Sequence, residues 1–234
     1  MTMQPIMTTQ PTPGIHVYYK PLGMSSYDVI RHIKRQLALQ GTTKPKIGHG
    51  GTLDPQAEGV LVIAIGREYT RQLAETLKGT PKTYEAIIYI GARSDTDDSE
   101  GPITPSDPGL VEEYVREHMT ALPDLSPFLH GYVQTPPRHS ALKILGKTAY
   151  ARTRAGEELD MSSKARHVEI YSLAITEYAF PYLSITVTCG SGTYIRSLAR
   201  DIGEHLGIGA YLDALKRTAV GEFRADEAIR IEEE

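Results

Sequence analysis

The sequence has very little cysteine and no long apolar run, and both absences narrow the class of protein. Its 234 residues include a single cysteine, Cys189, so the chain cannot form an internal disulfide or a zinc site built from several cysteines. Its apolar runs are far shorter than the roughly 20 residues that a membrane-spanning helix needs. No basic and then apolar signal opens the chain. We therefore expect a cytoplasmic protein with no membrane segment.

Common ligand-binding motifs are missing as well. The sequence contains no P-loop, no GxGxxG, no HExxH and no internal repeat. The acidic stretch at 94–101, SDTDDSEG, resembles a calcium-binding loop. Glu100, however, stands where an EF-hand needs glycine, and Ser106 stands where it needs a bidentate glutamate. We therefore predict no metal site.

The composition is that of an ordinary globular protein. Hydrophobic residues make up 40% of the chain and charged residues 23%, and this length allows a sizeable core. Residues 1–14 contain three prolines and no periodicity, which predicts a disordered tail. Residues 15–234 are expected to form a single domain, with an insertion around 134–160.

The distribution of charge is more informative than the net charge of −4. Two stretches, 31–53 and 134–156, contain five Lys or Arg each and no acid. The ten cations are Arg31, Lys34, Arg35, Lys44, Lys46, Arg138, Lys143, Lys147, Arg152 and Arg154. Either stretch alone is also explained by a solvated helix face. Together they favour a polyanionic partner, because phosphate contacts are local.

The segment Gly48–Gly66 contains the strongest candidate for a catalytic group. Three glycines surround His49, and the carboxylate of Asp54 follows before Pro55. The apolar run 60–65 then predicts a strand buried on both faces. Asp54 is thus expected on a loop beside a rigid strand, where catalytic groups are often held. The alternative is a turn in which Asp54 only caps its own backbone.

Strands and helices alternate without a regular βαβ rhythm, which predicts an α+β fold with a mixed, mainly antiparallel sheet and flanking helices. Strands are expected at 15–19, 60–65, 83–90 and 183–188. Helices are expected at 25–40, 71–78, 107–119, 147–155 and 193–206, with a last short helix that holds Leu212 and Leu215. The segment QTPPRHS at 134–140 is expected to be irregular, because two adjacent prolines block both helix and sheet.

Arg196 is predicted in the first turn of a helix that begins after Gly192. The helix dipole disfavours a cation there, so a specific anionic partner is expected. A surface arginine is the commoner alternative.

Six sequence blocks, in order, resemble the TruB family of tRNA pseudouridine synthases. They are YKPLGMSSYDV, GHGGTLDPQAEGVL, KTYEAIIYIGARSDTDDSEG, QTPPRHSALKILGKTAYARTRAG, CGSGTYIRSLARDIGEHLG and LKRTAVGEF. The resemblance runs from Tyr19 to Phe223. It implies a pseudouridine synthase fold and isomerisation of uridine 55 in the T loop of tRNA, without a cofactor.

The resemblance also implies roles for individual residues. Asp54 matches the nucleophilic aspartate. The residues that match the uridine pocket are His49, Tyr84, Tyr194, Arg196 and Leu215. The QTPPRHSALK block resembles a loop that clamps the T-arm stem-loop. This resemblance implies that Arg138, Lys143 and Lys147 contact the RNA backbone. We expect Arg196 to pair with Asp54, since a buried carboxylate needs a cation, and we expect a monomer.

Three features depart from the family pattern. His139 stands where an aromatic residue is usual, Arg71 lies one residue beyond the position of the usual lysine, and the chain ends without room for a C-terminal PUA domain. Two alternatives stay open. One is an RNA-binding or RNA-folding protein on the same fold, and the other is a synthase for a different RNA site.

Overall fold

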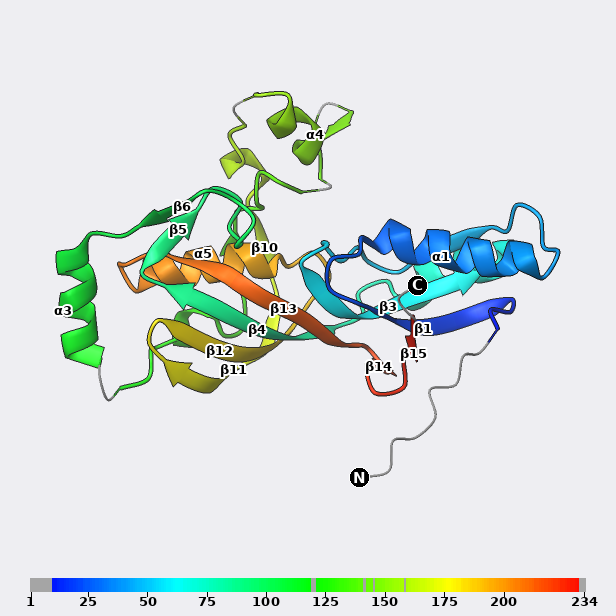
Figure 1. Ribbon diagram of the computed structural model, residues 1–234. Coiled ribbons are helices and arrows are strands. Elements are labelled where there is room, and N and C mark those ends of the chain that lie inside the picture. The colour runs from blue at the N-terminus through cyan, green and yellow to red at the C-terminus, as the bar shows by residue number, and fades with distance from the viewer. Residues whose placement is uncertain (1–9, 119–120, 141, 145, 158, 232–234) are drawn as a thin grey trace. The chain divides into compact units, whose positions relative to one another are not determined.

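A computed structural model describes residues 10–118, 121–140, 142–144, 146–157 and 159–231, and the chain forms two compact units (Figure 1). The first unit comprises the chain up to Tyr84 together with the part from Leu215 onwards, and the second comprises Glu85–Ala214. Strands β4 (Lys82–Ile90) and β13 (Ala210–Val220) have residues in both units.

The first unit is built on a mixed sheet with the strand order β13-β3-β1-β15. Its strands β1 (Gly14–Lys20) and β3 (Ala57–Ile65) are antiparallel, whereas β13 runs parallel to β3. Strand β15 (Ile229–Arg230) is parallel to β1, β2 (Ile47–His49) pairs with β3, and β14 (Phe223–Arg224) pairs with β13. Residues 1–9 of the predicted tail 1–14 lie outside the described residues, residues 10–13 form no helix or strand, and Gly14 opens β1.

Strand β3 is buried on both faces, as predicted. One face packs in a cluster with the apolar side of α1 (Ser26–Leu39), and the other packs with Leu73 of α2 (Arg67–Thr76). The first face is formed by Leu61, Ile63 and Ile65, and the second by Val60, Val62 and Ala64. Alternate residues of a strand point to opposite faces, so this one run supports two helices.

Helix α1 begins and ends where the sequence predicted. Ser25 and Asp28 form a capping box, and Gly41, with a φ of 81°, follows the end of the helix. Helix α2, in contrast, begins at Arg67 rather than at Arg71, directly after Gly66. The N-terminal turn of α2 carries charged and polar residues, so its pattern gave no apolar periodicity from which to place the start.

The second unit contains a sheet with the order β11-β12-β4-β13. Strands β11 (Ile170–Ala179) and β12 (Tyr182–Cys189) are antiparallel, and α5 (Ile195–His205) follows. The shorter helices are α3 (Pro108–His118), η1 (Ser126–Phe128), α4 (Ala149–Arg154) and η2 (Ser162–Lys164). Three short antiparallel pairs are β5 (Ala92–Ser94) with β6 (Ile103–Pro105), β7 (Tyr132–Gln134) with β10 (Arg166–Val168), and β8 (Lys143–Ile144) with β9 (Lys147–Thr148).

The predicted α+β class with a mixed, mainly antiparallel sheet is therefore confirmed. Residues 135–140 are irregular, as two adjacent prolines require. The helix expected at 147–155 is shorter, because Lys147 and Thr148 pair as β9 instead.

One element was wrongly predicted: the last short helix around Leu212 and Leu215 is the central part of strand β13. The leucine spacing fits a helical turn, yet the segment also carries the strand formers Tyr211, Thr218 and Val220. Strand preference depends strongly on neighbours, and β13 has a pairing partner on each side, β4 and β3. A local pattern could not reveal those partners.

Candidate active site and RNA-binding surface

Asp54 lies on the loop between β2 and β3 of the first unit and is exposed to solvent. The loop backbone is fixed from the start of α1. The Ser26 hydroxyl accepts a hydrogen bond from the Leu53 N–H at 2.8 Å and donates one to the Leu53 carbonyl at 2.9 Å. The residue before Asp54 is thus held in place by a buried side chain.

Lys20 is a buried cation that holds the other side of the same loop. It is 0% exposed. Its Nζ donates to the carbonyls of Pro21 at 2.9 Å, Met24 at 2.6 Å and Pro55 at 3.4 Å. Burial lowers the pKa of Lys20 to about 8, against the opposing charges of Asp54 and Glu58. Lys20 is therefore mostly protonated at neutral pH, and it brings a positive charge to the loop that carries Asp54.

Arg217 is a second buried cation, 1% exposed, on strand β13. Its Nε donates to the Val60 carbonyl at 2.8 Å, and its Nη2 donates to the Gly51 carbonyl at 3.0 Å. A Cβ at Gly59 would collide with the Arg217 backbone, and Gly59 has a φ of 108°. The glycine therefore permits the close approach of β13 that brings Arg217 to the loop.

Three of the expected pocket residues share one face of the sheet in the first unit. His49 pairs with Ile63 and Leu215 pairs with Ala57, two positions of β3 that point the same way. Thr83 and Lys216 line one cavity and therefore share the opposite face. Tyr84, which is 7% exposed, follows Thr83 along β4 and so points to the face of Leu215. His49, Tyr84 and Leu215 therefore lie on a common side of the sheet, and their expected role in a uridine pocket stays a prediction.

His49 is expected to be neutral at neutral pH. Burial lowers its pKa, and the charge of Arg217 lowers it further, against a hydrogen bond with the Gly51 backbone that raises it. A neutral imidazole can accept or donate a hydrogen bond, so His49 suits a positioning role better than a charged one.

In the second unit, Arg196 has the specific anionic partner that its place in the first turn of α5 predicted. The residue is 9% exposed, which excludes the surface alternative. Its Nη1 donates to Asp98 Oδ2 at 3.2 Å and to the Thr96 carbonyl at 3.3 Å, and its Nη2 donates to the His139 carbonyl at 2.7 Å. Arg196 therefore joins the acidic loop at 95–98 to the irregular segment at 135–140. The expected pairing of Arg196 with Asp54 stays a prediction.

Arg200, one turn further along α5, makes similar connections. It donates to Asp97 at 2.8 Å, to Asp201 at 2.8 Å and to the Thr135 carbonyl at 2.9 Å. Burial raises the pKa of Asp97 to about 6, against the charges of Arg200 and Arg196. The acidic stretch that resembled a calcium loop is thus held by two arginines. Among the described residues, no group of three or more His, Cys, Asp or Glu could hold a metal ion.

Tyr194 immediately precedes α5 and is held through its backbone. Its N–H donates to Gln134 Oε1 at 2.8 Å, and its carbonyl accepts from Gln134 Nε2 at 3.1 Å. The Arg166 guanidinium lies 5.9 Å from the centre of its ring. Gln134, at the end of β7, thereby joins the irregular segment to the start of α5.

The predicted RNA-clamping segment borders a cavity of about 590 Å³ in the second unit. Arg138 and His139 line it together with Asp97 and Arg200. Lys143 and Lys147 lie in the paired strands β8 and β9. Arg71, whose role the sequence left open, is an exposed residue of α2 in the first unit.

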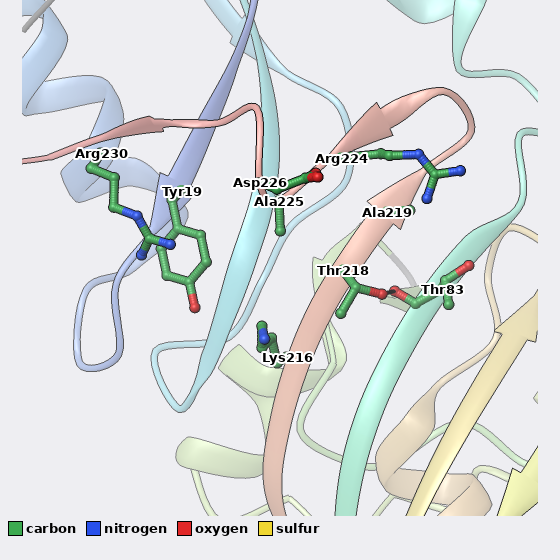
Figure 2. Close-up of a pocket in the computed structure, with 9 residues that line it drawn as sticks. All are labelled: Tyr19, Thr83, Lys216, Thr218, Ala219, Arg224, Ala225, Asp226 and Arg230. Atoms are coloured by element: carbon green, nitrogen blue, oxygen red, sulfur yellow. Dashed lines mark hydrogen bonds between the residues drawn. The ribbon is translucent and has the colours of Figure 1, made fainter. Parts of the chain in front are cut away.

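A cavity of about 390 Å³ opens in the first unit (Figure 2). Lys216, Arg224, Asp226 and Arg230 line it, with the Arg230 guanidinium 4.0 Å from the centre of the Tyr19 ring. Its lining includes Thr83 and Lys216, which lie on the sheet face opposite Tyr84 and Leu215. This mixed-charge cavity is therefore separate from the candidate site.

Sequence reasoning named Asp54 and Arg196, whose roles stay predictions. It gave no role to Lys20, Ser26 and Arg217, which hold the Asp54 loop, or to Arg200, which holds the loops around α5. Arg217 is a cation within a strand-forming segment. That pattern is the sequence signal that could have indicated a buried arginine. No helix in the described part of the chain is long and apolar enough to span a membrane.

Comparisons with known proteins identify the family of this chain. The model of the TruB family pseudouridylate synthase N-terminal domain matches residues 34–195, and that of the tRNA pseudouridylate synthase B C-terminal domain matches residues 196–233. A protein named tRNA pseudouridine synthase B from Xanthomonas campestris pv. campestris (strain 8004) is 41% identical, over 98% of this chain and 70% of its own length. One of the same name from Corynebacterium aurimucosum is 42% identical, over 92% and 69%.

Among solved structures, a Cbf5-Nop10-Gar1 complex contains a chain similar to this one. The TM-score is 0.62 and the identity 27%, over 93% of this chain and 52% of that chain. The chain thus spans about half the length of that solved chain.

Proposed function

Because the chain belongs to the TruB family of pseudouridylate synthases, we propose that it converts uridine 55 in the T loop of tRNA into pseudouridine, with Asp54 as the nucleophile. Membership makes the protein a tRNA pseudouridine synthase, which is an isomerase. The position of the uridine and the role of Asp54 are the proposal.

The observation that carries the proposal is the fixed loop around Asp54. Ser26 bonds Leu53, Lys20 bonds Pro55 and Arg217 bonds Gly51, so the backbone is held on both sides of an exposed aspartate. A nucleophile acts efficiently when its position is set before the substrate arrives. A loop in which Asp54 only capped its own backbone would not need two buried cations.

The reaction needs a carboxylate and no redox partner. The N1–C1′ bond of uridine breaks, the base turns over and a C5–C1′ bond forms. C5 loses its proton and N1 gains one, so substrate and product are isomers. A carboxylate can form a covalent intermediate and then leave again, as in glycoside chemistry. The nucleophile must be ionised, and Lys20 places a positive charge beside its loop. We propose that no cofactor takes part.

Tyr84, His49 and Leu215 are proposed to receive the uridine on their common sheet face. A base must leave the T-loop stack to reach Asp54, and stacking on an aromatic ring stabilises such a base by about 1–3 kcal/mol. Tyr84 is the ring proposed for that contact and for helping to remove the C5 proton. Tyr194 and Arg196 are assigned to the same uridine by the family motif.

The RNA is proposed to be the T-arm stem-loop, bound by a monomer. Arg138, Lys143 and Lys147 belong to an acid-free stretch of the sequence, and cations of this kind contact phosphates without reading the bases. The hydrogen bonds that Arg196 and Arg200 donate to backbone carbonyls within 135–140 would fix the start of this segment.

Incubation of the purified protein with an unmodified tRNA transcript, followed by mapping of pseudouridine along the RNA, tests the proposal. We expect one modified position, uridine 55, both in the transcript and in an isolated T-arm stem-loop. Modification at another position would identify a synthase for a different site. Binding without any modification would favour an RNA-folding protein.

A further inference from the structure

The five cations of the basic stretch at 31–53 have no part in the function proposed so far, and the structure gives three of them a definite arrangement. Three of its residues join Tyr27 on α1. These four residues, Tyr27, Arg31, Lys34 and Arg35, form what we name the α1 basic stripe. Tyr27, Arg31 and Lys34 stand at positions i, i+4 and i+7, which share one flank of a helix.

Three residues of the stripe are exposed and Lys34 is partly buried, and two of its cations lie beside the Tyr27 ring. Tyr27 is 59% exposed, and the Arg31 side chain is 64% exposed. The Arg31 guanidinium lies 5.9 Å and the Lys34 ammonium 5.8 Å from the centre of the Tyr27 ring. An exposed aromatic ring with two cations beside it is a surface typical of RNA contacts, because bases stack on the ring and phosphates meet the cations.

The charges of α1 are unevenly distributed around the helix. The apolar face contains Val29, Ile30, Ile33 and Leu37 and is buried. The stripe lies along one edge of this apolar face, and Asp28, His32 and Gln36 lie along the other edge. His32 and Gln36 form a hydrogen bond of 2.8 Å. Asp28 is the one acid in residues 27–53, and it caps the helix and bonds Arg31. An ordinary solvated helix mixes both signs on its exposed side in similar measure, whereas α1 carries three cations and this one acid.

The stripe begins next to the candidate nucleophile within the same unit. Ser26, the first residue of α1, bonds both backbone groups of Leu53, which precedes Asp54. Tyr27 follows Ser26, and Lys34 lies about 10 Å further along the axis at 1.5 Å per residue. RNA with a uridine at Asp54 therefore has phosphates within reach of this helix.

We propose that the α1 basic stripe binds the phosphodiester backbone of the RNA strand whose uridine reaches Asp54. The inference rests on the proposed function for the identity of that RNA. The occupant follows from charge complementarity: a cationic flank with an exposed tyrosine, beside the catalytic loop, fits a polyanion that carries stacking bases. The contacts add affinity and do not take part in the chemistry.

The test measures the affinity of unmodified T-arm stem-loop RNA at several KCl concentrations, for the parent and for Arg31→Gln/Lys34→Gln. Each lost phosphate contact should reduce the slope of log K against log salt by about 0.7–0.9, and two should weaken binding about 20-fold at 0.15 M salt. The kcat at saturating RNA should stay at the parental value. Lys34→Gln alone leaves the Ser25–Asp28 cap and the Arg31–Asp28 pair intact and should show about half the effect.

Arg224→Gln is the matched control, because Arg224 is an exposed cation of the same unit that lines the cavity in Figure 2. It should leave both slope and affinity unchanged. A parental slope in the folded double variant would overturn the inference, as would a parent that does not bind the RNA.

The readout is binding, so it separates the two proposals. A stripe-dependent slope without pseudouridine would contradict only the proposed function, and pseudouridine formation with an unchanged slope would contradict only the stripe.

Discussion

At the scale of single residues, two buried cations hold the backbone on either side of Asp54. Arg217 bonds the Gly51 carbonyl, and Lys20 bonds the Pro55 carbonyl. Burying a charge is costly unless its hydrogen bonds are satisfied, and here backbone carbonyls satisfy them. This arrangement fixes where Asp54 lies and places positive charge beside it.

Arg217→Lys should lower kcat more than it weakens RNA binding. Lysine keeps the charge but cannot bond both Val60 and Gly51 with a planar fork. The loop should then shift, and misplacing a catalytic group by about 1 Å costs on the order of a hundredfold in rate. Single-turnover rates and RNA dissociation constants check this. Arg224→Lys, at an exposed position of the same unit, serves as control. A folded Arg217→Lys variant with the parental kcat would show that Arg217 does not position the nucleophile.

The residues that carry the proposed chemistry were easier to foresee than those that hold them. Glycine and proline spacing around Asp54 marks a shaped loop in any sequence. Arg217 follows Asp54 by more than 160 residues, and nothing local links the two. Arg200 could not be told from a solvated arginine, because its partners Asp97 and Thr135 come from two distant loops.

At the scale of elements, α5 connects the acidic loop to the start of the clamp segment. Its apolar face is buried, through Ile195, Leu198, Ala199 and Ile202. Arg196 and Arg200 extend from the same helix to 96–98 and to 135–139. Residues four apart on a helix lie side by side, so one helix holds both loops at once.

Asp97→Asn should change how stability depends on pH. Burial raises the pKa of Asp97 to about 6 from its ordinary value of 3.8, so the folded protein binds more protons than the unfolded chain between those pH values. The contribution of this group to the free energy of unfolding is therefore fully present below pH 3.8 and is lost as the pH rises through about 6. Asparagine cannot titrate and lacks this dependence.

Thermal melts at pH 4, 5, 6 and 7 measure the effect. Relative to the asparagine variant, the parent should lose stability as the pH rises across this range. Asp95→Asn, an exposed change in the same loop, is the control and should follow the parent. A constant difference in Tm between parent and Asp97→Asn at every pH would contradict the assignment.

Elements with strong local signals were predicted well, and those set by neighbours were not. The capping box of α1 and the apolar run of β3 define their elements without tertiary information. Strand β13 was mistaken for a helix because its place between β4 and β3 is a property of the sheet. Leu215 was named for the pocket through a motif, whereas its position on the His49 face comes from the strand register.

At the scale of the whole molecule, a net charge of −4 coexists with proposed binding of a polyanion. The account predicts that RNA binding is strongly salt-dependent, since local cations and not the net charge displace counterions. Replacing Arg138, Lys143 and Lys147 by glutamine should reduce the slope of log K against log salt by about 2 to 3 in total. Binding titrations between low and physiological salt check this. An unchanged slope would return the clamp segment to the solvated-helix alternative.

The central claim is that Asp54 performs the chemistry, and Asp54→Asn tests it most directly. The amide preserves the shape of the side chain and removes the nucleophile. The measurement is the single-turnover rate of pseudouridine formation in an unmodified T-arm stem-loop, together with the dissociation constant of that RNA. The account predicts no detectable pseudouridine and a dissociation constant within about threefold of the parent, because the phosphate contacts that supply most of the affinity are untouched. A variant that forms pseudouridine within tenfold of the parental rate would contradict the account.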